Sequence, residues 1–320
     1  MARIAISLGD PCGIGPEVVV RALAARPDVD AIVYGDAGML ARAAGSAGVP
    51  APAADRIRAV TTLSPGDVPP GKPNDEAGQA QLAYLAAATT AALAGEVAGL
   101  VTAPISKHWI ARAGFAFPGH TEYLASRAGV REFAMMLAGP SLRVTVATTH
   151  VPLRDVAGLL TADGIASTIW LTAEGLARRF GIAAPRVAVA GLNPHAGEAG
   201  RFGDEEDRLV RPAIEAARAR IAAAEIPAEI SGPHVPDVVF RDAARGRYDA
   251  VVALYHDQGL IPLKLLHFDE GVNVTLGLPF VRTSPDHGTA YDIAGSGRAS
   301  AGAAARRARP RGARPPAQPG

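Results

Sequence analysis

Short apolar runs alternate with longer alanine-rich stretches along most of the chain, and this alternation predicts the fold. Runs of roughly four to eight apolar residues are typical of strands, whereas apolar residues at helical spacing predict helices. We expect strands at residues 4–8, 31–34, 98–102, 133–137, 143–148, 186–190 and 250–254. We expect helices at residues 16–25, 39–44, 75–94, 167–180 and 205–224. The order predicts an α/β fold of mostly parallel sheets with helices on both faces, with residues 133–148 forming a hairpin.

Polar residues follow five of the predicted strands directly. These are Gly9-Asp10-Pro11, Thr102-Ala103-Pro104, Thr149-His150, Asn193-Pro194-His195 and Tyr255-His256-Asp257. In open α/β sheets, ligands bind beyond the carboxyl ends of the strands. The sequence therefore predicts an active site at this edge.

Length and composition restrict the class of protein. A chain of 320 residues, 48% of them hydrophobic, is long enough for two α/β lobes. The formal net charge of +1 gives no basic field, so we expect no nucleic-acid partner. The single cysteine, Cys12, indicates a reducing compartment, and no leader-like or membrane-length apolar run occurs. We expect a cytoplasmic protein without membrane contact.

Three histidines are candidate metal ligands because each stands just after a predicted strand: His150, His195 and His256. Imidazole nitrogens suit zinc and similar divalent metals, and open sites commonly use three protein ligands. The spacings of 45 and 61 residues match no short metal motif. Hydrogen-bonded structural histidines therefore remain an equal interpretation.

Other residues are candidates for binding an anionic substrate. His120 and Thr121 lie in a turn that opens a helix, where they either cap it or contact a phosphate or carboxylate. Lys264 lies in an apolar stretch, where burial is costly unless an anion meets the ammonium group. Asn273 and Arg282 follow in strand-like segments and suit the same ligand, with snorkelling side chains as the alternative.

Eight motifs in fixed order resemble the 4-hydroxythreonine-4-phosphate dehydrogenase family of vitamin B6 synthesis. They are GDPCGIGPE at 9–17, TAPISK at 102–107, PGHTEYLA at 118–125, TTHVPL at 148–153, GLNPHAGE at 191–198, GPHVPD at 232–237, YHDQG at 255–259 and GVNVTLGLPFVRTSPDHGTAYDIAG at 271–295. The resemblance covers residues 1–295. The first motif is a glycine-rich turn that lacks the G-x-G-x-x-G spacing, and taken alone it is either a tight turn or a ligand loop.

The resemblance implies a two-lobe, isocitrate/isopropylmalate dehydrogenase-like fold. The expected lobes are 1–125 plus 285–295, and 126–284. It implies a homodimer with the active site at the subunit interface, NAD or NADP as cofactor, and zinc, magnesium or cobalt as divalent metal. No cofactor-binding residue is assigned. The implied site residues are the metal ligands His150, His195 and His256, the substrate-binding His120, Thr121, Lys264, Asn273 and Arg282, and the catalytic Lys264 and Asp257.

The implied reaction oxidises 4-phosphohydroxy-L-threonine to 2-amino-3-oxo-4-phosphooxybutanoate, which decarboxylates to 3-amino-2-oxopropyl phosphate. A divalent cation would lower the pKa of the substrate hydroxyl. One alternative is a related enzyme acting on D-erythronate or D-threonate 4-phosphate. Another is an inactive metal- or ligand-binding product.

The sequence departs from the resemblance after Gly295. Family members continue with an apolar helix, whereas residues 296–320 contain only small, polar, Arg and Pro residues. Such a segment lacks the side chains of a core, so we expect a disordered tail. A change of reading frame near residue 296 is one hypothesis for its origin.

Overall fold

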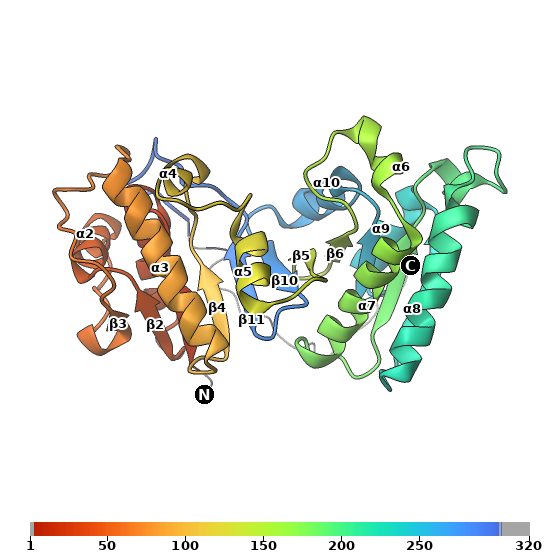
Figure 1. Ribbon diagram of the computed structural model, residues 1–320, viewed down its shortest axis with the longest axis horizontal. Helices are drawn as coiled ribbons and strands as arrows, with labels where there is room; N and C mark the ends of the chain where they lie inside the picture. The colour runs from red at the N-terminus through yellow and green to blue at the C-terminus, as the bar shows by residue number, and fades with distance from the viewer. Residues whose placement is uncertain (1–2, 301, 303–320) are drawn as a thin grey trace. The chain divides into compact units, whose positions relative to one another are not determined.

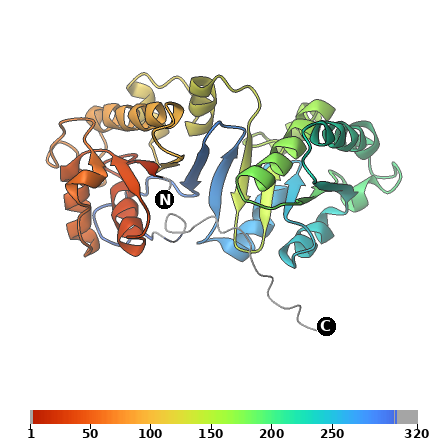
Figure 2. The ribbon, with the colours of Figure 1, turned by 90° about the horizontal axis from the view of Figure 1, so that it is seen from below.

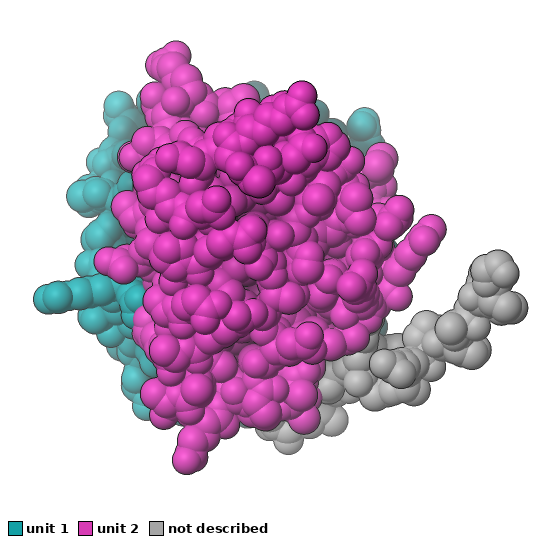
Figure 3. All heavy atoms as spheres, turned by 90° about the vertical axis from the view of Figure 1, so that its right-hand side faces the viewer, with its two compact units in different colours: residues 1–133, 269–306 teal, residues 134–268, 307–320 magenta. Residues whose placement is uncertain are grey.

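The computed structural model describes residues 3–300 and 302, which form two compact units (Figure 1). The first unit contains residues 3–133 with 269–300 and 302, and the second contains residues 134–268 (Figure 3). Each unit is a helix-covered sheet. The predicted α/β architecture therefore holds within both.

The sheet of the first unit has the strand order β3-β2-β1-β4-β11-β10. Its strands are β1 (Ile4–Ser7), β2 (Ala31–Tyr34), β3 (Ile57–Arg58), β4 (Gly99–Thr102), β10 (Val272–Leu276) and β11 (Val281–Pro285). All pairs within it are parallel except β10 with β11. Its helices are α1 (Gly15–Ala25), α2 (Ala37–Ala47), α3 (Asp75–Leu93), α4 (Lys107–Arg112) and α5 (His120–Ala128), with a short 3-10 turn at Ala54–Arg56.

Side chains of β1 alternate between two cores, as the pleat of a strand requires. Ile6 packs with residues of α1 and α2, whereas Ala5 packs with Leu85 of α3 and Leu124 of α5. The side chains of Ala5, Ile6, Leu85 and Leu124 are all buried. Helices therefore cover both faces of this sheet, which explains why its strands are almost continuously apolar.

The sheet of the second unit has the order β5-β6-β9-β7-β8. Its strands are β5 (Ala134–Ala138), β6 (Arg143–Val146), β7 (Arg186–Ala190), β8 (Glu229–His234) and β9 (Ala250–Ala253). Its helices are α6 (Val156–Leu159), α7 (Ala162–Arg178), α8 (Arg211–Ala223), α9 (Pro236–Ala244) and α10 (His256–His267), with 3-10 turns at Leu153–Asp155 and Pro194–Gly197 and a π-helical turn, η4 (Glu206–Val210). Helices α7 and α8 lie on one face, and α9 and α10 on the other (Figure 2).

The predicted hairpin is confirmed, because β5 and β6 pair antiparallel. The remaining pairs of this unit, β6 with β9, β9 with β7 and β7 with β8, are parallel. The helix predicted at residues 205–224 begins as the π-helical turn η4 before α8 continues it.

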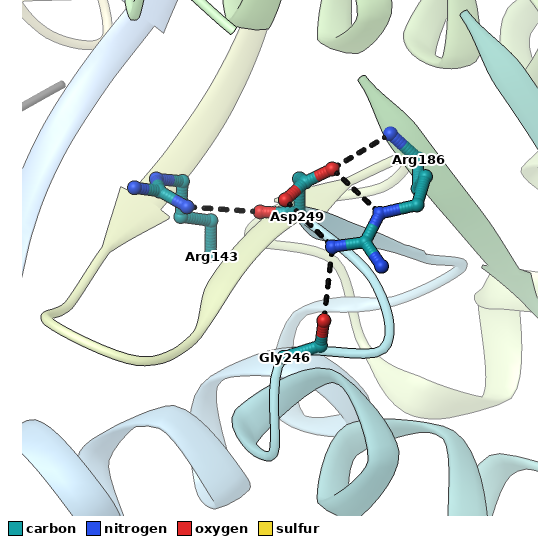
Figure 4. A network of polar contacts seen from close by, with 4 residues as sticks. All are labelled: Arg143, Arg186, Gly246 and Asp249. Carbon is teal, nitrogen blue, oxygen red and sulfur yellow. Dashed lines mark hydrogen bonds and ion pairs between the residues drawn. The ribbon is translucent and has the colours of Figure 1, made fainter. Parts of the chain in front are cut away.

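Charged groups join the amino ends of three neighbouring strands of the second unit (Figure 4). Arg186 at the start of β7 donates to the Asp249 carboxylate through Nε and Nη2, both at 3.2 Å, and to the Gly246 carbonyl at 2.9 Å. Arg143 at the start of β6 donates to the backbone carbonyl of Asp249 at 3.1 Å. Because Asp249 is only 10% exposed, this ion pair is better shielded from water than the surface pairs elsewhere.

The boundary between the units differs from the expected lobes. Residues 269–284, expected in the second lobe, lie in the first unit because β11 pairs with β4 and β10 pairs with β11. Residues 126–133 also lie there. In the predicted tail, Ala299 is 3% exposed and packs with Ile14 and Val18. The rest of the tail, 301 and 303–320, lies outside the described residues.

In the part of the chain that the structure describes, no single helix has the length and apolar character needed to cross a membrane. One sharply bent pair of segments, Leu153–Leu159 and Ala162–Arg178, passes that test only when its two parts are combined.

Candidate active site

The three candidate metal ligands follow three adjacent parallel strands of the second unit. His150 comes after β6, His256 comes after β9 as the first residue of α10, and His195 comes after β7, with β9 between the other two strands. The ring centroids of His150 and His256 are 5.3 Å apart. Within one chain, no group of three His, Cys, Asp or Glu side chains among the described residues is arranged to hold a metal ion. The structure therefore brings two of the three imidazoles together.

The side chain of Asp257 orients one of these imidazoles. Its Oδ1 lies 2.7 Å from Nδ1 of His256. A carboxylate partner on one ring nitrogen fixes the ring and favours a tautomer that leaves the other nitrogen, Nε2, as the electron-pair donor. Asp257 is therefore well placed to hold the His256 ring in an orientation that suits a metal ligand.

The loop that carries His195 has an unusual backbone. His195 and Ala196 have φ values of 53° and 52°, and Glu198 and Ala199 follow with 43° and 55°. The left-handed conformation costs a residue with a Cβ roughly 1–2 kcal/mol. Four such residues in five positions require support from the surrounding structure.

A cluster of polar side chains surrounds Arg282 in the first unit. Its guanidinium donates from Nη2 to Thr102 Oγ1 at 2.7 Å and from Nη1 to Thr275 Oγ1 at 3.0 Å, with Thr121 Oγ1 at 3.5 Å. The residue is only 3% exposed. Burial lowers the pKa of Arg282 to about 10, and the Glu122 carboxylate acts in the opposite direction. The group therefore stays cationic at neutral pH.

Three buried polar atoms of this cluster lack a hydrogen-bond partner among the described residues: His120 Nε2, Asn273 Oδ1 and Arg282 Nε. Burial holds the pKa of His120 well below its usual value, and the cations Arg282 and Lys107 lower it further. The imidazole is therefore neutral at pH 7. Buried polar atoms without partners are costly in a finished core but appropriate in a site that receives a polar ligand.

Thr121 contacts Arg282 and does not cap α5, since Gly119 occupies the N-cap position of that helix. Lys264 lies on α10, so the apolar stretch around it is a helix of the second unit, with Pro262 inside it. Thr275 was not singled out from the sequence. Thr102 was named there only within a polar strand-end segment, and Lys107 only within the TAPISK motif, so neither was assigned a role.

The glycine-rich turn after β1 is closed by its own aspartate. The buried Asp10 carboxylate accepts from the Cys12 backbone N–H at 2.8 Å, from Gln81 Nε2 at 3.0 Å and from the Tyr291 hydroxyl at 2.5 Å. Burial raises the pKa of Asp10, although the hydrogen bonds from the Tyr291 hydroxyl and the Cys12 backbone N–H oppose the shift. Gln81 also accepts from the Ser106 backbone N–H at 2.7 Å. The turn is thus connected to α3, to the loop before α4 and to the segment after β11.

Both units are α/β, and they place histidines, an arginine and threonine hydroxyls near the ends of their strands. These features are those of an α/β enzyme suited to a small anionic substrate. A family model described as "Pyridoxal phosphate biosynthetic protein PdxA" matches residues 28–308. The chain belongs to this family.

Individual relatives agree with this assignment. A protein from Desulfosudis oleivorans named 4-hydroxythreonine-4-phosphate dehydrogenase is 52% identical over 314 residues, which cover 92% of this chain and 91% of the relative. A protein of the same name from Trichlorobacter lovleyi is 46% identical and covers 93% of both. A crystal structure of a 4-hydroxythreonine-4-phosphate dehydrogenase from Klebsiella pneumoniae matches with a TM-score of 0.84 and 42% identity, covering 95% of both chains.

These matches confirm the predicted family, the isocitrate/isopropylmalate dehydrogenase-like fold and the prediction of an enzyme of pyridoxal phosphate biosynthesis.

Proposed function

We propose that the chain oxidises 4-phosphohydroxy-L-threonine with NAD or NADP in a reaction that needs a divalent metal. The product, 2-amino-3-oxo-4-phosphooxybutanoate, is a β-keto acid that loses carbon dioxide to give 3-amino-2-oxopropyl phosphate. Support comes from the names of the relatives together with the polar clusters of the two units. We further propose a cytoplasmic location.

The observation that carries the metal proposal is the placement of His150, His195 and His256 after three adjacent parallel strands. Nitrogen ligands of this kind fit zinc or cobalt better than magnesium, which prefers oxygen ligands. When bound, a divalent cation would lower the pKa of the substrate hydroxyl and favour loss of its proton. Asp257 would hold the His256 ring in a ligating orientation through the 2.7 Å contact.

The substrate would bind through its anionic groups. The buried Arg282 cation, with unpaired polar atoms of His120 and Asn273 beside it, suits a phosphate or carboxylate oxygen. Because His120 is neutral at pH 7, it would act as a hydrogen-bonding partner and not as a second cation. Thr121 and Lys264 complete the proposed substrate group, and we assign Lys264 and Asp257 to catalysis as well.

We propose a homodimer whose active sites lie at the subunit interface. Large apolar side chains are exposed on and just after α10: Ile261 at 65%, Leu265 at 84%, Leu266 at 50% and Phe268 at 77%. Ile261, Leu265 and Phe268 recur at spacings of four and three, so they share one face of the helix. A second copy of the chain would cover this face. It would also supply the ligand that completes the metal site, since one chain gathers no group of three among its described residues.

The test is NADH or NADPH production from 4-phosphohydroxy-L-threonine, with and without a chelator. Parallel reactions would contain D-erythronate 4-phosphate and D-threonate 4-phosphate. We expect the phosphorylated threonine derivative to give the highest kcat/KM and the chelator to abolish turnover. Higher kcat/KM with either sugar-acid phosphate would replace the proposed substrate. Metal uptake without turnover of any of the three would indicate an inactive ligand-binding protein.

A further inference from the structure

A buried carboxylate supports the loop that carries His195. Glu206, at the start of the π-helical turn η4, is 2% exposed. Its Oε1 accepts hydrogen bonds from the backbone N–H groups of Leu192 and Asn193, both at 2.8 Å, and its Oε2 accepts from Asn193 Nδ2 at 3.0 Å. One side chain thus satisfies three donors of the segment that leads to His195.

Two glycines make room for this carboxylate. A Cβ on Gly197 would lie 2.7 Å from Glu206 Oε2, and one on Gly191 would lie 3.1 Å from Glu206 Oε1. The loop therefore closes around the carboxylate on both sides of His195. Hydrogen bonds to a carboxylate are roughly twice as strong as bonds between neutral groups. The bonds to Glu206 therefore offset the cost of the left-handed backbone at His195 and Ala196.

A carboxamide connects the same loop to the turn that carries His256. Gln258, two residues after His256, is 9% exposed. Its Oε1 accepts from the backbone N–H of Leu254, the residue after β9, at 2.7 Å. Its Nε2 donates to the backbone carbonyl of Gly191 after β7, also at 2.7 Å. Both ends of this side chain are used, so it sets the separation between the two loops.

We infer that Glu206 and Gln258 are positioning residues that hold the His195 loop and the His256 turn in place before any metal binds. This inference rests on the metal-dependent function proposed above. Groups that orient metal ligands typically change metal affinity ten- to a hundredfold when they are replaced. The same loss is the expected effect at these two positions.

The first experiment titrates metal-free, full-length protein with Co²⁺ and follows its visible absorption spectrum. Glu206→Gln keeps the volume of the side chain, but its carboxamide has one acceptor oxygen and one NH2 donor, so either Asn193 Nδ2 or the two backbone N–H groups lose their acceptor and face a donor. We expect its Co²⁺ affinity to fall ten- to a hundredfold and its spectrum at saturating Co²⁺ to change. Asp207→Asn is the matched control, because the adjacent Asp207 carboxylate is exposed and pairs with Arg211 at 2.7 Å. Its affinity and spectrum should equal those of the unaltered protein.

A second variant and a measurement on the unaltered chain keep the inference testable if Glu206→Gln fails to fold. Gln258→Glu retains the acceptor for Leu254 but loses the donor to Gly191, and a similar loss of Co²⁺ affinity is expected. In the unaltered, metal-free protein, the amides of Leu192 and Asn193 should be protected from hydrogen exchange.

Three outcomes would overturn the inference. The first is a folded Glu206→Gln or Gln258→Glu protein with unaltered Co²⁺ affinity and spectrum. The second is rapid exchange of both amides until metal is added. Either leaves the proposed function standing. The third is an unaltered protein that takes up no Co²⁺, which would remove the metal-dependent function as well.

Discussion

The exposed apolar face of α10 allows a quantitative prediction for the variant Leu265→Asp. Complete burial of a large aliphatic or aromatic side chain contributes about 1.5–3 kcal/mol. Scaled by their exposed fractions, Ile261, Leu265 and Phe268 would together contribute roughly 3–7 kcal/mol per subunit if a second copy covered them. This gain is large enough to offset part of the entropy lost on association. The α10 face is therefore the main candidate for the dimer contact.

Leu265 is the most exposed of the three, at 84%. In a symmetric dimer the substitution occurs twice, so the loss of apolar burial alone would be about 3–5 kcal/mol. That corresponds to a dissociation constant raised roughly a hundredfold to several thousandfold, and the buried carboxylates would raise it further. Sedimentation velocity over a concentration series measures this constant directly. Activity should fall with the dimer fraction, because the metal site is proposed to need both subunits.

A matched control is Leu93→Asp, which alters a leucine at the end of α3 in the first unit that is 37% exposed. This variant should remain dimeric and active. The reasoning is refuted if folded Leu265→Asp has the same dissociation constant as the unaltered chain.

Three further outcomes are expected. Chelation should abolish turnover. Added Zn²⁺ or Co²⁺ should restore turnover in the unaltered enzyme but not in the His150→Ala variant. Full activity of the chelated enzyme would contradict this expectation. Arg282→Lys keeps the charge but loses the forked contacts to Thr102 and Thr275, so KM for the phosphorylated substrate should rise about tenfold or more, and an unchanged KM would count against the proposed role. The pKa of His120 is lowered in the folded chain, so below about pH 6.5 the unfolded chain binds a proton at this residue and the folded chain does not. The free energy of unfolding therefore falls as pH falls below this value. Between pH 7 and 5.5, urea denaturation of His120→Gln should therefore show an acid loss smaller by up to about 1 kcal/mol, and equal losses would show that His120 titrates normally.

Strand positions were predictable because burial on both faces leaves a short, uniform apolar run. The runs at residues 31–34 and 186–190 coincide with β2 and β7. Helix α10 was not predicted, since Pro262 interrupts it and its apolar residues occur on both its buried and its exposed sides. Leu263 is buried whereas Leu265 is exposed, a difference that depends on contacts far along the chain.

Site residues were predictable where a motif follows the end of a strand. They were less predictable where the residue that they contact lies far away in the sequence. Arg282 was singled out, but its partner Thr102 lies 180 residues earlier in the chain and becomes a partner only because β4 pairs with β11. Glu206 gave no signal at all. Its partners are mainly backbone N–H groups, which have no counterpart in the amino-acid sequence.

The order of the strands in the first unit also bears on how the chain folds during synthesis. Strand β11 inserts between β4 and β10, yet it leaves the ribosome after all of residues 134–268. Until then the outer edge of β4 lacks this partner, and open strand edges favour pairing with other chains. A nascent chain halted before β11 should therefore aggregate through the open edge of β4 in its first unit.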